Sequence, residues 1–335
     1  MKNITIFLDG TWNDQENPDT LSNVALLHQM SLNDNLQQIS YYGEGVGTDG
    51  FYDMKLGGLH GVGLSKNIRE AYTFLVENYK ENDKVFIFGF SRGAFTARSL
   101  AGLIYGCGVL PKSDNMSSDI KKLYKAYQDK DSTKKEAYKA ANKKCPIQML
   151  GVWDTVGALG VPISIFKNVS DSIINFHDTK LNSEVQFACH AIALDERRDS
   201  FQPTLWDVTP ENKNRIKQVW FSGVHSDVGG GYEERHHSDI ALRWMQEQAE
   251  SCGMLINSEK PYEYKDNIDL DIHESVYKIF GNEVGEKNRK AQLTADHKPI
   301  IHNSVLEKMK KRIDYKPTAL WDSDNDTLAP FEIDE

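Results

Sequence analysis

Short runs of apolar residues alternate with amphipathic stretches along this chain, a pattern that predicts strands separated by helices. Four runs have the length of buried strands and end in polar or glycine-rich residues: Ile4 to Leu8, Lys84 to Phe88, Gln148 to Trp153 and Lys217 to Ser222. Because strands that alternate with helices usually pair in parallel, we expect an α/β fold with a mostly parallel sheet and helices on both faces. The loops after the carboxyl ends of such strands are where chemistry is expected.

Apolar residues at helical spacing follow the first and the second run. The spacing i, i+3, i+4 and i+7 between these two runs predicts a helix with one face on the sheet: Ile68, Ala71, Tyr72 and Leu75. A second helix is expected over Arg92 to Ile104, where small apolar residues recur at the same spacing and allow close approach to the sheet.

The length of 335 residues exceeds a typical domain of roughly 100–200 residues but suits a large α/β fold with insertions. We expect a single domain over residues 1–320 and an acidic tail over residues 321–335. Residues 112–144 contain ten lysines and five acidic residues, which predicts a helical insertion. A solvated helical cap is the favoured interpretation of it, and contact with an anionic lipid surface is the alternative. Residues 258–296 are highly charged with weak apolar periodicity and are expected as surface insertions.

Composition narrows the class of protein. The formal charge of −10 argues against a general nucleic-acid binder. The 4 cysteines are scattered, which excludes a disulfide scaffold and a zinc ribbon. The first apolar run is too short for a secretory signal, and no stretch has the roughly 18 apolar residues of a membrane span. The expected location is therefore the cytoplasm of the producing cell, with export by a signal-independent secretion system as an alternative.

A Gly-x-Ser-x-Gly motif follows the second run, at Gly89-Phe90-Ser91-Arg92-Gly93. It stands between a predicted strand and a predicted helix, which is the context that a nucleophile elbow requires. The tight turn would raise the serine hydroxyl above the sheet, and the helix would direct its first amides at a developing oxyanion. Ser91 is therefore the candidate nucleophile, and the N–H of Arg92 is a candidate oxyanion donor.

A serine nucleophile needs a base and a carboxylate that holds the base, and in this fold class the chain order is serine, acid, histidine. Asp154 ends the third run, where a carboxylate is costly unless it is hydrogen-bonded or paired. His225 follows the fourth run and begins a glycine-rich loop. Asp154 and His225 complete a candidate Ser-Asp-His triad.

Four other histidines compete for the role of base. His302 precedes Asn303-Ser304-Val305, could reach the site from a late loop and is the reserve base. His190 stands among apolar residues and is expected as a core histidine in a helical setting. His236 and His237 lie in a charged stretch and are expected at the surface.

Two further acids are expected to support loops at the site. Asp227 either fixes the loop of the candidate base or serves as the orienting acid itself. Asp9 ends the first run and would anchor a tight polar turn in which Gly10 or Thr11 supplies the second oxyanion amide. The aspartyl nucleophile of a phosphotransferase is disfavoured, because its pattern needs another acid at the position of Phe7.

The motifs imply no cofactor. Three carboxylates and a histidine could converge on a hard cation, although their spacing alone does not indicate a metal site: Asp9, Asp154, Asp227 and His225. The glycine-rich stretch from Tyr42 to Thr48 lacks both the G-x-G-x-x-G pattern and a P-loop lysine, so nucleotide binding is not expected.

Seven motifs in the same order resemble the α/β-hydrolase domain of bacterial type VI secretion phospholipase effectors, a domain that also occurs in many uncharacterised microbial proteins. They are Phe7-Leu8-Asp9-Gly10-Thr11-Trp12-Asn13, Asn23-Val24, Gly45-Val46-Gly47-Thr48, Gly89 to Arg98, Val152 to Gly157, Ala193 to Arg198 and His225 to Tyr232. The resemblance extends from about residue 3 to about residue 310. It implies an α/β-hydrolase-like fold with helical insertions.

The resemblance also implies roles for individual residues. The serine of the Gly-Phe-Ser-Arg-Gly motif is the nucleophile of the effectors, which corresponds to Ser91 here. Their triad aspartate and histidine correspond to Asp154 and His225. The run from Asp195 to Arg198 is a family feature that we interpret as a structural ion-pair cluster. Effectors of this kind imply a phospholipid substrate and a secretion or immunity partner.

The function that the sequence favours is a serine hydrolase of carboxylic esters, in particular a phospholipase A-type lipid acyl hydrolase with peripheral membrane contact and no nucleic-acid partner. Two alternatives stay open. One is a small-molecule carboxylesterase or deacylase with the same triad, and the other is a non-catalytic binding module of an effector assembly.

Overall fold

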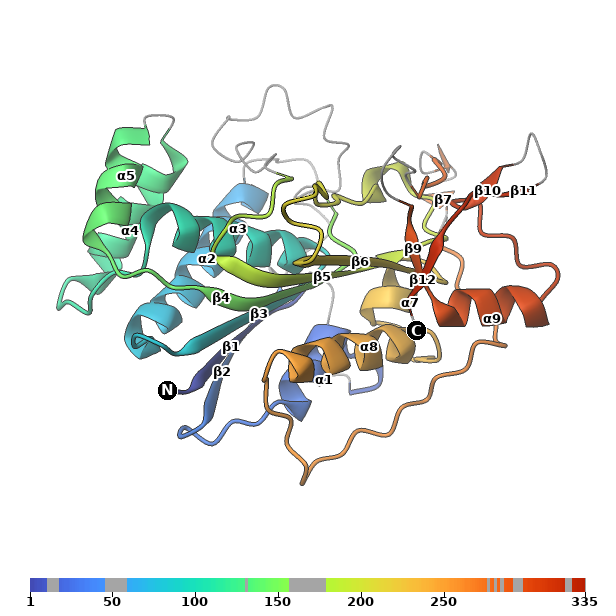
Figure 1. Cartoon of the computed structure of the whole chain (residues 1–335), viewed down its shortest axis with the longest axis horizontal. Coiled ribbons are helices and arrows are strands. Elements are labelled where there is room, and N and C mark those ends of the chain that lie inside the picture. Colours follow the sequence, from blue (N-terminus) through green and yellow to red (C-terminus); the bar gives the residue numbers. More distant parts are fainter. Residues whose placement is uncertain are drawn as a thin grey trace.

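The structure, a computed structural model, has a central sheet of eight parallel strands with helices on both faces (Figure 1). It describes residues 1–10, 18–45, 59–129, 132–156, 179–275, 278–279, 282–283, 286–291, 298–322 and 327–334. The strand order is β12-β9-β6-β5-β4-β3-β1-β2. This arrangement confirms the predicted α/β fold, which is consistent with an α/β-hydrolase-like architecture.

The strands of the central sheet are β1 (Asn3–Leu8), β2 (Gln38–Gly43), β3 (Lys84–Phe90), β4 (Ile147–Trp153), β5 (Val185–Ala193), β6 (Ile216–Phe221), β9 (Ile300–His302) and β12 (Glu332–Asp334). Two small antiparallel pairs lie outside it: β7 (Lys278–Ile279) with β8 (Asn282–Glu283), and β10 (Trp321–Asp322) with β11 (Thr327–Leu328). The four predicted strands correspond to β1, β3, β4 and β6. Their apolar runs are continuous because both faces of the sheet are covered.

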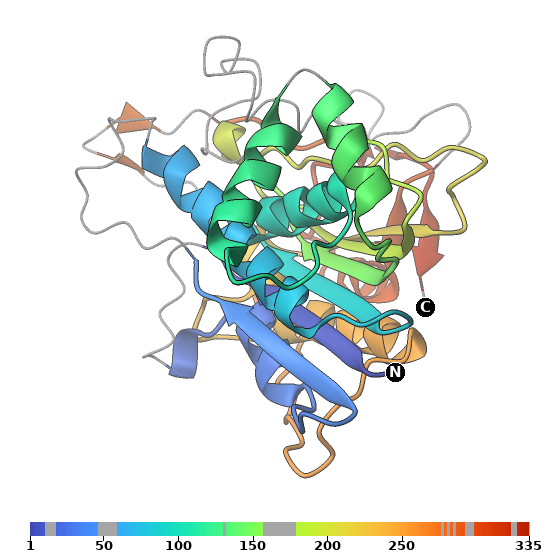
Figure 2. The ribbon, with the colours of Figure 1, turned by 90° about the vertical axis from the view of Figure 1, so that its left-hand side faces the viewer.

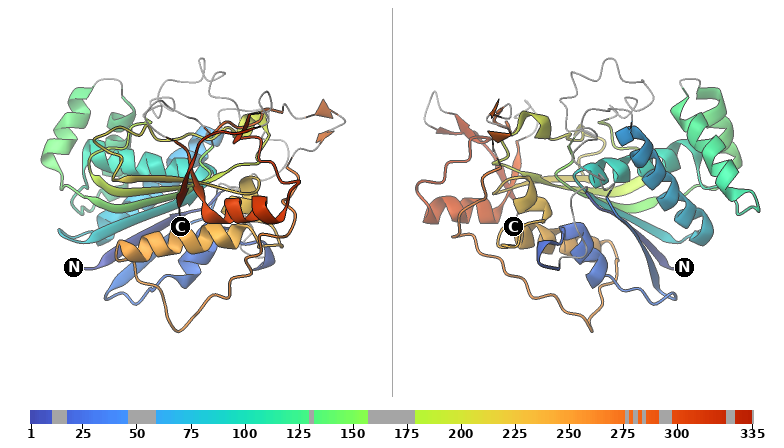
Figure 3. Two further views of the ribbon diagram at one scale, coloured as in Figure 1. Left: turned by 45° about the vertical axis from the view of Figure 1, so that its right-hand side comes forward. Right: turned by 180° about the vertical axis from the view of Figure 1, so that it is seen from behind.

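The helices are α1 (Asn23–Met30), α2 (Leu59–Asn78), α3 (Arg92–Cys107), α4 (Met116–Gln128), α5 (Ser132–Ala141), α7 (His225–Gly229), α8 (Ser238–Ser251) and α9 (Asn303–Lys311), with short 3-10 turns at Pro18–Thr20 and Asp199–Phe201. The helices α2 and α3 cover one face of the sheet, and α1 and α8 cover the other (Figures 1 and 3). Both helices predicted from apolar spacing are therefore confirmed, as α2 and α3.

Successive side chains of a strand point to opposite faces of the sheet, so alternate residues pack into two separate hydrophobic cores. In β1, Ile4, Ile6 and Leu8 pack with α2 and α3, whereas Phe7 packs with α1 and α8. Phe7 stacks on Phe88 of the neighbouring strand β3, with ring centroids 5.2 Å apart. The two cores hold β1 and β3 side by side, so their carboxyl ends lie at the same edge of the sheet.

The lysine-rich residues 112–144 contain α4 and α5, which lie across α3 and away from the sheet (Figure 2). Helix α4 buries Ile120, Leu123 and Tyr124 against the core on the α2 and α3 side of the sheet. Helix α5 has no buried residue. The lysine-rich helices therefore form a layer that is added on the outside of α3.

The structure corrects three expectations. His190 lies in strand β5 rather than in a helix. The described end of the chain, residues 327–334, is not a separate tail, because β12 pairs with β9 and Asp334 forms an ion pair with Lys217 at 2.7 Å. The charged stretch over residues 258–296 is more than a surface insertion, because Ser275 and Arg289 are buried. No helix of the described segments is long and apolar enough to cross a bilayer.

Candidate active site

The turn between β3 and α3 holds Ser91 in a strained backbone conformation, with φ 57° and ψ −121°. A non-glycine residue in this region costs of order 1–3 kcal/mol and is typical of functional sites. The two motif glycines permit the turn. A Cβ on Gly89 would lie 2.4 Å from the carbonyl oxygen of Gly93, and a Cβ on Gly93 would lie 2.1 Å from the carbonyl oxygen of Leu8. The first turn of α3 can therefore touch the end of β1.

This close approach brings the loop after β1 to the serine. The Cβ position of Gly10 lies 3.4 Å from the Cβ of Ser91. The buried carboxylate of Asp9 accepts hydrogen bonds from the N–H of Gly10 at 2.6 Å and from the hydroxyls of Ser22 and Tyr42, each at 2.5 Å. Asp9 thus anchors the loop, and the Gly10 amide is engaged by it. Thr11 lies outside the described residues.

Asp154 follows the last residue of β4, the neighbour of β3, and is fully buried with φ 38°. Its Oδ2 lies 2.5 Å from Nδ1 of His225. Its Oδ1 accepts the N–H of Ala193 on β5 at 3.0 Å. The backbone therefore presents this carboxylate to the histidine.

His225 is the first residue of α7, which begins shortly after β6. Its ring lies between Phe90, at 4.6 Å between centroids, and Phe201, at 4.9 Å. Burial between these rings lowers the pKa of His225, although Asp154 acts in the opposite direction. With Nδ1 held by the carboxylate, Nε2 is the nitrogen left to accept a proton. Between the described atoms of Ser91 and His225 the structure has no hydrogen bond, whereas the ring of Phe90, next to Ser91, contacts the imidazole.

Arg289 is a site residue that the sequence analysis missed. Its side chain is buried, and it donates to both oxygens of Asp154, at 2.6 and 2.9 Å. It also donates to the carbonyl oxygens of Ala193 and Phe201. Burial alone would raise the pKa of Asp154, but the Arg289 charge and the hydrogen bonds from His225 and Arg289 lower it well below its usual range. An isolated arginine in a charged stretch carries no local signal that could have revealed this contact.

Asp227 bonds to its own loop and to a distant segment rather than to His225. It accepts the N–H of Val224 at 3.0 Å and lies 2.6 Å from Nδ1 of His273. The hydrogen bond to Asp227 is the main cause that raises the pKa of His273. Of the two roles predicted for Asp227, the geometry fits support of the loop that carries the candidate base.

The run from Asp195 to Arg198 forms the ion-pair cluster that its composition indicated. Glu196 is fully buried, pairs with Arg198 at 2.8 Å and accepts the N–H of His225 at 3.2 Å. Burial would raise the pKa of Glu196, but Arg198 lowers it to about 2. The Arg198 guanidinium in turn lies over the ring of Phe201, at 3.5 Å. The cluster therefore supports both the backbone and the ring of His225.

The remaining candidate histidines lie outside the triad. His190 is a buried core residue whose Nε2 accepts the N–H of Thr155 at 3.1 Å, and burial lowers its pKa to about 3. His302 caps α9 and stacks on Phe221 at 4.8 Å. The expectation for His237 was wrong, because it is buried and lies 3.2 Å from Nζ of Lys308.

Among the described residues, no group of three or more acidic, histidine or cysteine side chains is arranged to hold a metal ion. The segments after β3, β6 and β4 carry a hydroxyl, an imidazole and a buried carboxylate. The carboxylate and the imidazole are in contact, and the ring of Phe90, next to Ser91, lies 4.6 Å from that of His225. Such a set can generate a serine nucleophile without a metal ion.

Two of the solved structures that are similar to this chain are informative about its coverage. One is an uncharacterized protein from Pseudomonas aeruginosa, with TM-score 0.50 and 21% identity, which covers 76% of this chain and 46% of that chain. Another is the Tle1 effector bound to the VgrG spike from the type 6 secretion system, with TM-score 0.42 and 21% identity over 69% of this chain and 51% of that chain.

A curated relative is the uncharacterized protein YEL023C of Saccharomyces cerevisiae, which is 29% identical over 238 residues. The match covers 62% of this chain but 33% of the yeast protein. The chain thus spans about a third of this relative and under half of the Pseudomonas structure.

A family match covers residues 2–248 and carries the description "T6SS, Phospholipase effector Tle1-like, catalytic domain". It includes Ser91, Asp154 and His225 but ends before Arg289. Because the match covers well over half of the sequence, the chain belongs to the family of Tle1-like catalytic domains of type VI secretion phospholipase effectors.

Proposed function

We propose that this protein is a serine hydrolase that cleaves a carboxylic ester of a glycerophospholipid, with Ser91 as nucleophile, His225 as general base and Asp154 as the acid that orients the base. The observation that carries the proposal is the buried pair of Asp154 and His225, 2.5 Å apart, beside a serine in a strained strand-to-helix turn. Membership of a family of phospholipase effector domains supports the lipid substrate.

In the proposed reaction, Ser91 Oγ attacks the acyl carbonyl carbon while its proton passes to Nε2 of His225. The tetrahedral intermediate collapses, the ester C–O bond breaks, and the leaving alcohol takes the proton from Nε2. Water then attacks the acyl-enzyme by the same route, with His225 first accepting and then returning a proton. The products are a free fatty acid and a lysophospholipid, as expected of a phospholipase A.

The oxyanion of the intermediate needs two donors. Arg92 is the first residue of α3, so its N–H has no partner within the helix and lies at the positive end of the helix dipole. We propose that its amide is the first donor. The second would come from the Gly10/Thr11 loop. The Gly10 amide donates to Asp9 at 2.6 Å. To bind the oxyanion, this N–H would have to break that hydrogen bond and donate to the substrate oxygen instead.

We assign Arg289 as a positioning residue. Its guanidinium donates a hydrogen bond to each oxygen of Asp154. These bonds keep the carboxylate ionised and fix its orientation towards His225. When the imidazole is protonated during the reaction, the proton therefore remains on His225. The ionised carboxylate of Asp154 then stabilises the positively charged imidazolium.

The proposed partners follow from the family and from the surface. The solved Tle1 effector is bound to a VgrG spike, so a secretion-system partner is proposed here, together with an immunity protein. Exposed lysines of the α4–α5 layer support peripheral contact with an anionic membrane: Lys121, Lys122, Lys125 and Lys134.

The test compares phospholipid vesicles with a soluble butyryl ester, using wild type, Ser91→Ala and Ser251→Ala. Ser251 is an exposed serine at the end of α8 and serves as the matched control. The proposal predicts release of fatty acid and lysophospholipid by wild type and the control, and at least a thousandfold loss in Ser91→Ala. Cleavage of the soluble ester alone would indicate a carboxylesterase. Folded protein with no activity on either substrate would indicate a binding module.

A further inference from the structure

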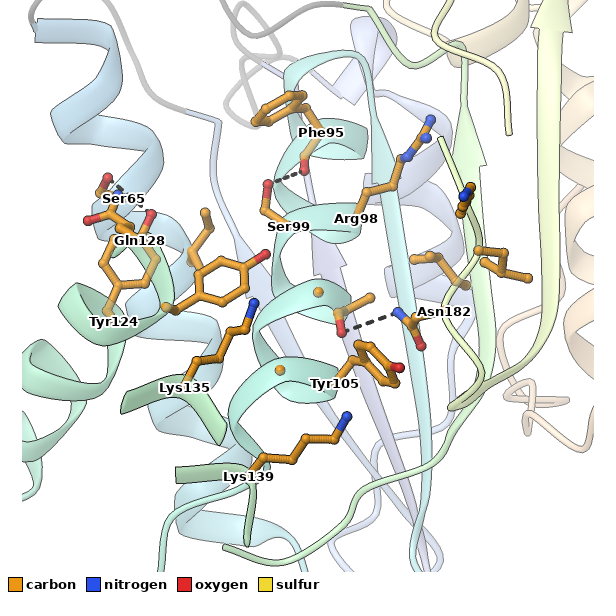
Figure 4. Close-up of a pocket in the computed structure, with 18 of the residues that line it drawn as sticks. Ser65, Phe95, Arg98, Ser99, Tyr105, Tyr124, Gln128, Lys135, Lys139 and Asn182 are labelled. Atoms are coloured by element: carbon orange, nitrogen blue, oxygen red, sulfur yellow. Dashed lines mark hydrogen bonds between the residues drawn. The ribbon is translucent and has the colours of Figure 1, made fainter. Parts of the chain in front are cut away.

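A cavity of about 490 Å³ lies between α2, α3, α4 and α5, outside the candidate active site (Figure 4). None of Ser91, Asp154 and His225 lines it. Its volume falls within the range of roughly 300–1,000 Å³ that is typical of small-molecule sites. The lysine-rich helices α4 and α5 close it on one side. No step of the proposed reaction involves these two helices.

The cavity runs along α3. Its lining extends from Phe95, one turn after Ser91, to Gly106 near the end of the helix. These eleven steps of about 1.5 Å correspond to about 16 Å of helix. Small residues open this face of α3: Ser99, Ala101, Gly102 and Gly106. The space is therefore long enough for an extended chain rather than only for a compact ion.

Apolar and aromatic side chains form much of the wall. They are Leu64, Ile68, Phe95, Tyr105, Tyr124, Tyr127, Leu150, Leu181 and Trp206. Two of these rings, Tyr124 and Tyr127, lie 6.4 Å apart on α4. Such a wall favours a ligand with an apolar body.

Four basic side chains line the cavity: Arg98, Lys135, Lys139 and Lys180. Arg98 donates to the carbonyl oxygen of Thr204 and lies over the ring of Trp206, whereas two of the lysines lie at the Gly106 end. Figure 4 shows Lys135 and Lys139 reaching from α5 towards α3. The stem of Lys135 packs against Gly106, with its Cδ 3.3 Å from the Cβ position of the glycine, and Nζ of Lys139 lies 3.9 Å from the ring centre of Tyr105. Among the described residues, no acidic side chain forms an ion pair with either lysine. Two acidic residues, Asp129 and Glu136, also line the cavity, and Asp129 pairs with Lys134 at 3.3 Å. Lys135 and Lys139 are therefore the groups that can meet an anion at this end of the cavity.

We propose that this cavity binds a single-chain anionic amphiphile, with its acid group at Lys135 and Lys139 and its chain along α3. The two α5 lysines and the aromatic and aliphatic wall along α3 match the two parts of such a molecule, because Arg98, the basic side chain nearer Phe95, already bonds to Thr204. The binding is separate from catalysis, because the triad does not line the cavity.

The test uses Ser91→Ala protein, so that turnover does not enter, and laurate as the probe, below its micellar concentration, with calorimetry as the readout. The expected result is saturable binding of one laurate per chain. The double variant Lys135→Glu/Lys139→Glu should weaken it at least tenfold. The control Lys121→Glu/Lys144→Glu reverses two exposed charges outside the cavity and should bind as the parent does.

Three further probes test the ligand class: butyrate, inorganic phosphate and dodecyltrimethylammonium. None of them should displace laurate. Equal binding of butyrate or phosphate would reveal a small-anion site and overturn the proposal, as would equal binding of the cationic amphiphile.

Unchanged laurate binding in the Lys135/Lys139 variant would also overturn the proposal, because the lysines would then only complement the negative end of α3. Thermal unfolding of each variant checks that it is folded. A negative result would leave the proposed hydrolysis by Ser91 untouched, since that activity is measured separately.

Discussion

Arg289 and Asp154 are joined by hydrogen bonds of 2.6 and 2.9 Å across 135 residues of sequence. Both side chains are fully buried. The arginine comes from a segment beyond the family match over residues 2–248, yet it holds the carboxylate that contacts His225. The candidate site therefore depends on the carboxyl-terminal part of the chain as well as on the matched motifs.

Replacing Arg289 with Met should destabilise the protein by about 3–5 kcal/mol, because it leaves the buried Asp154 carboxylate without its main counter-charge. Urea unfolding at pH 7 measures this loss. Since the pKa of Asp154 is lowered in the folded state, the contribution of the pair is complete above the unfolded value of about 3.9 and is lost as the pH falls below it. The difference between wild type and variant should therefore shrink below about pH 4.

Two variants serve as controls for Arg289. Arg243→Met removes a half-exposed ion pair with Asp266 and should cost under about 1 kcal/mol. Adding Asp154→Asn to Arg289→Met should recover part of the lost stability, because the uncompensated charge is removed. A double variant that is less stable than Arg289→Met would contradict the pairing.

The pH dependence of ester hydrolysis should report His225. The imidazole must be neutral to accept the serine proton, and burial lowers its pKa below the ordinary 6.5. The acid limb of kcat/KM should therefore have its midpoint below pH 6.5, with activity falling tenfold per pH unit beneath it. Glu196→Gln removes a carboxylate that raises this pKa, so the midpoint should move lower still. A wild-type midpoint above pH 7 is the result that this account does not allow.

Gly93→Ala should destabilise the protein by about 3 kcal/mol and disturb the elbow, because the added Cβ would lie 2.1 Å from the backbone oxygen of Leu8. Gly106→Ala on the same helix is the matched control. There the nearest atom, at 3.3 Å, belongs to the flexible stem of Lys135. The free energy of unfolding of Gly106→Ala should therefore equal that of wild type or exceed it by up to about 1 kcal/mol. Equal stability of the two variants in urea unfolding would show that the contact between α3 and β1 is not tight.

His273 should contribute pH-dependent stability to the loop of His225. Its pKa is raised in the folded state, chiefly by the hydrogen bond with Asp227. Its contribution is therefore complete below the unfolded value of about 6.5 and disappears as the pH rises through the folded pKa. His273→Asn should be less stable than wild type at pH 5.5, with a smaller difference at pH 8.5. His236→Asn is the control, and an NMR titration that finds the His273 pKa below 6.5 would refute the prediction.

The sequence predicted the strands that are mostly apolar, such as β1 and β4, because burial on both faces favours apolar residues at successive positions. It missed β2, whose polar Gln38 and Ser40 lie at the edge of the sheet. It placed His190 in a helix, since periodicity cannot distinguish a short buried strand from a buried helical segment. Both errors arise because secondary structure here depends on tertiary contacts, which the local sequence pattern does not reveal.

The candidate triad could be chosen from the sequence because its members follow strand ends in a fixed chain order. Arg289 could not, because its position depends on the path of the chain after residue 275 rather than on any local motif. The same holds for His273, which reaches Asp227 across 46 residues. Sequence pattern thus indicated the candidate triad but not the distant side chains of Arg289 and His273 that contact Asp154 and Asp227.

Reaction with a fluorophosphonate, followed by intact mass and peptide mapping, tests the central claim most directly, because such probes label activated serines and leave ordinary ones unmodified. The account predicts a single adduct on Ser91 in wild type and none in Ser91→Ala or His225→Ala. An adduct that persists in Ser91→Ala, or folded wild type that stays unlabelled with and without anionic vesicles, would contradict it.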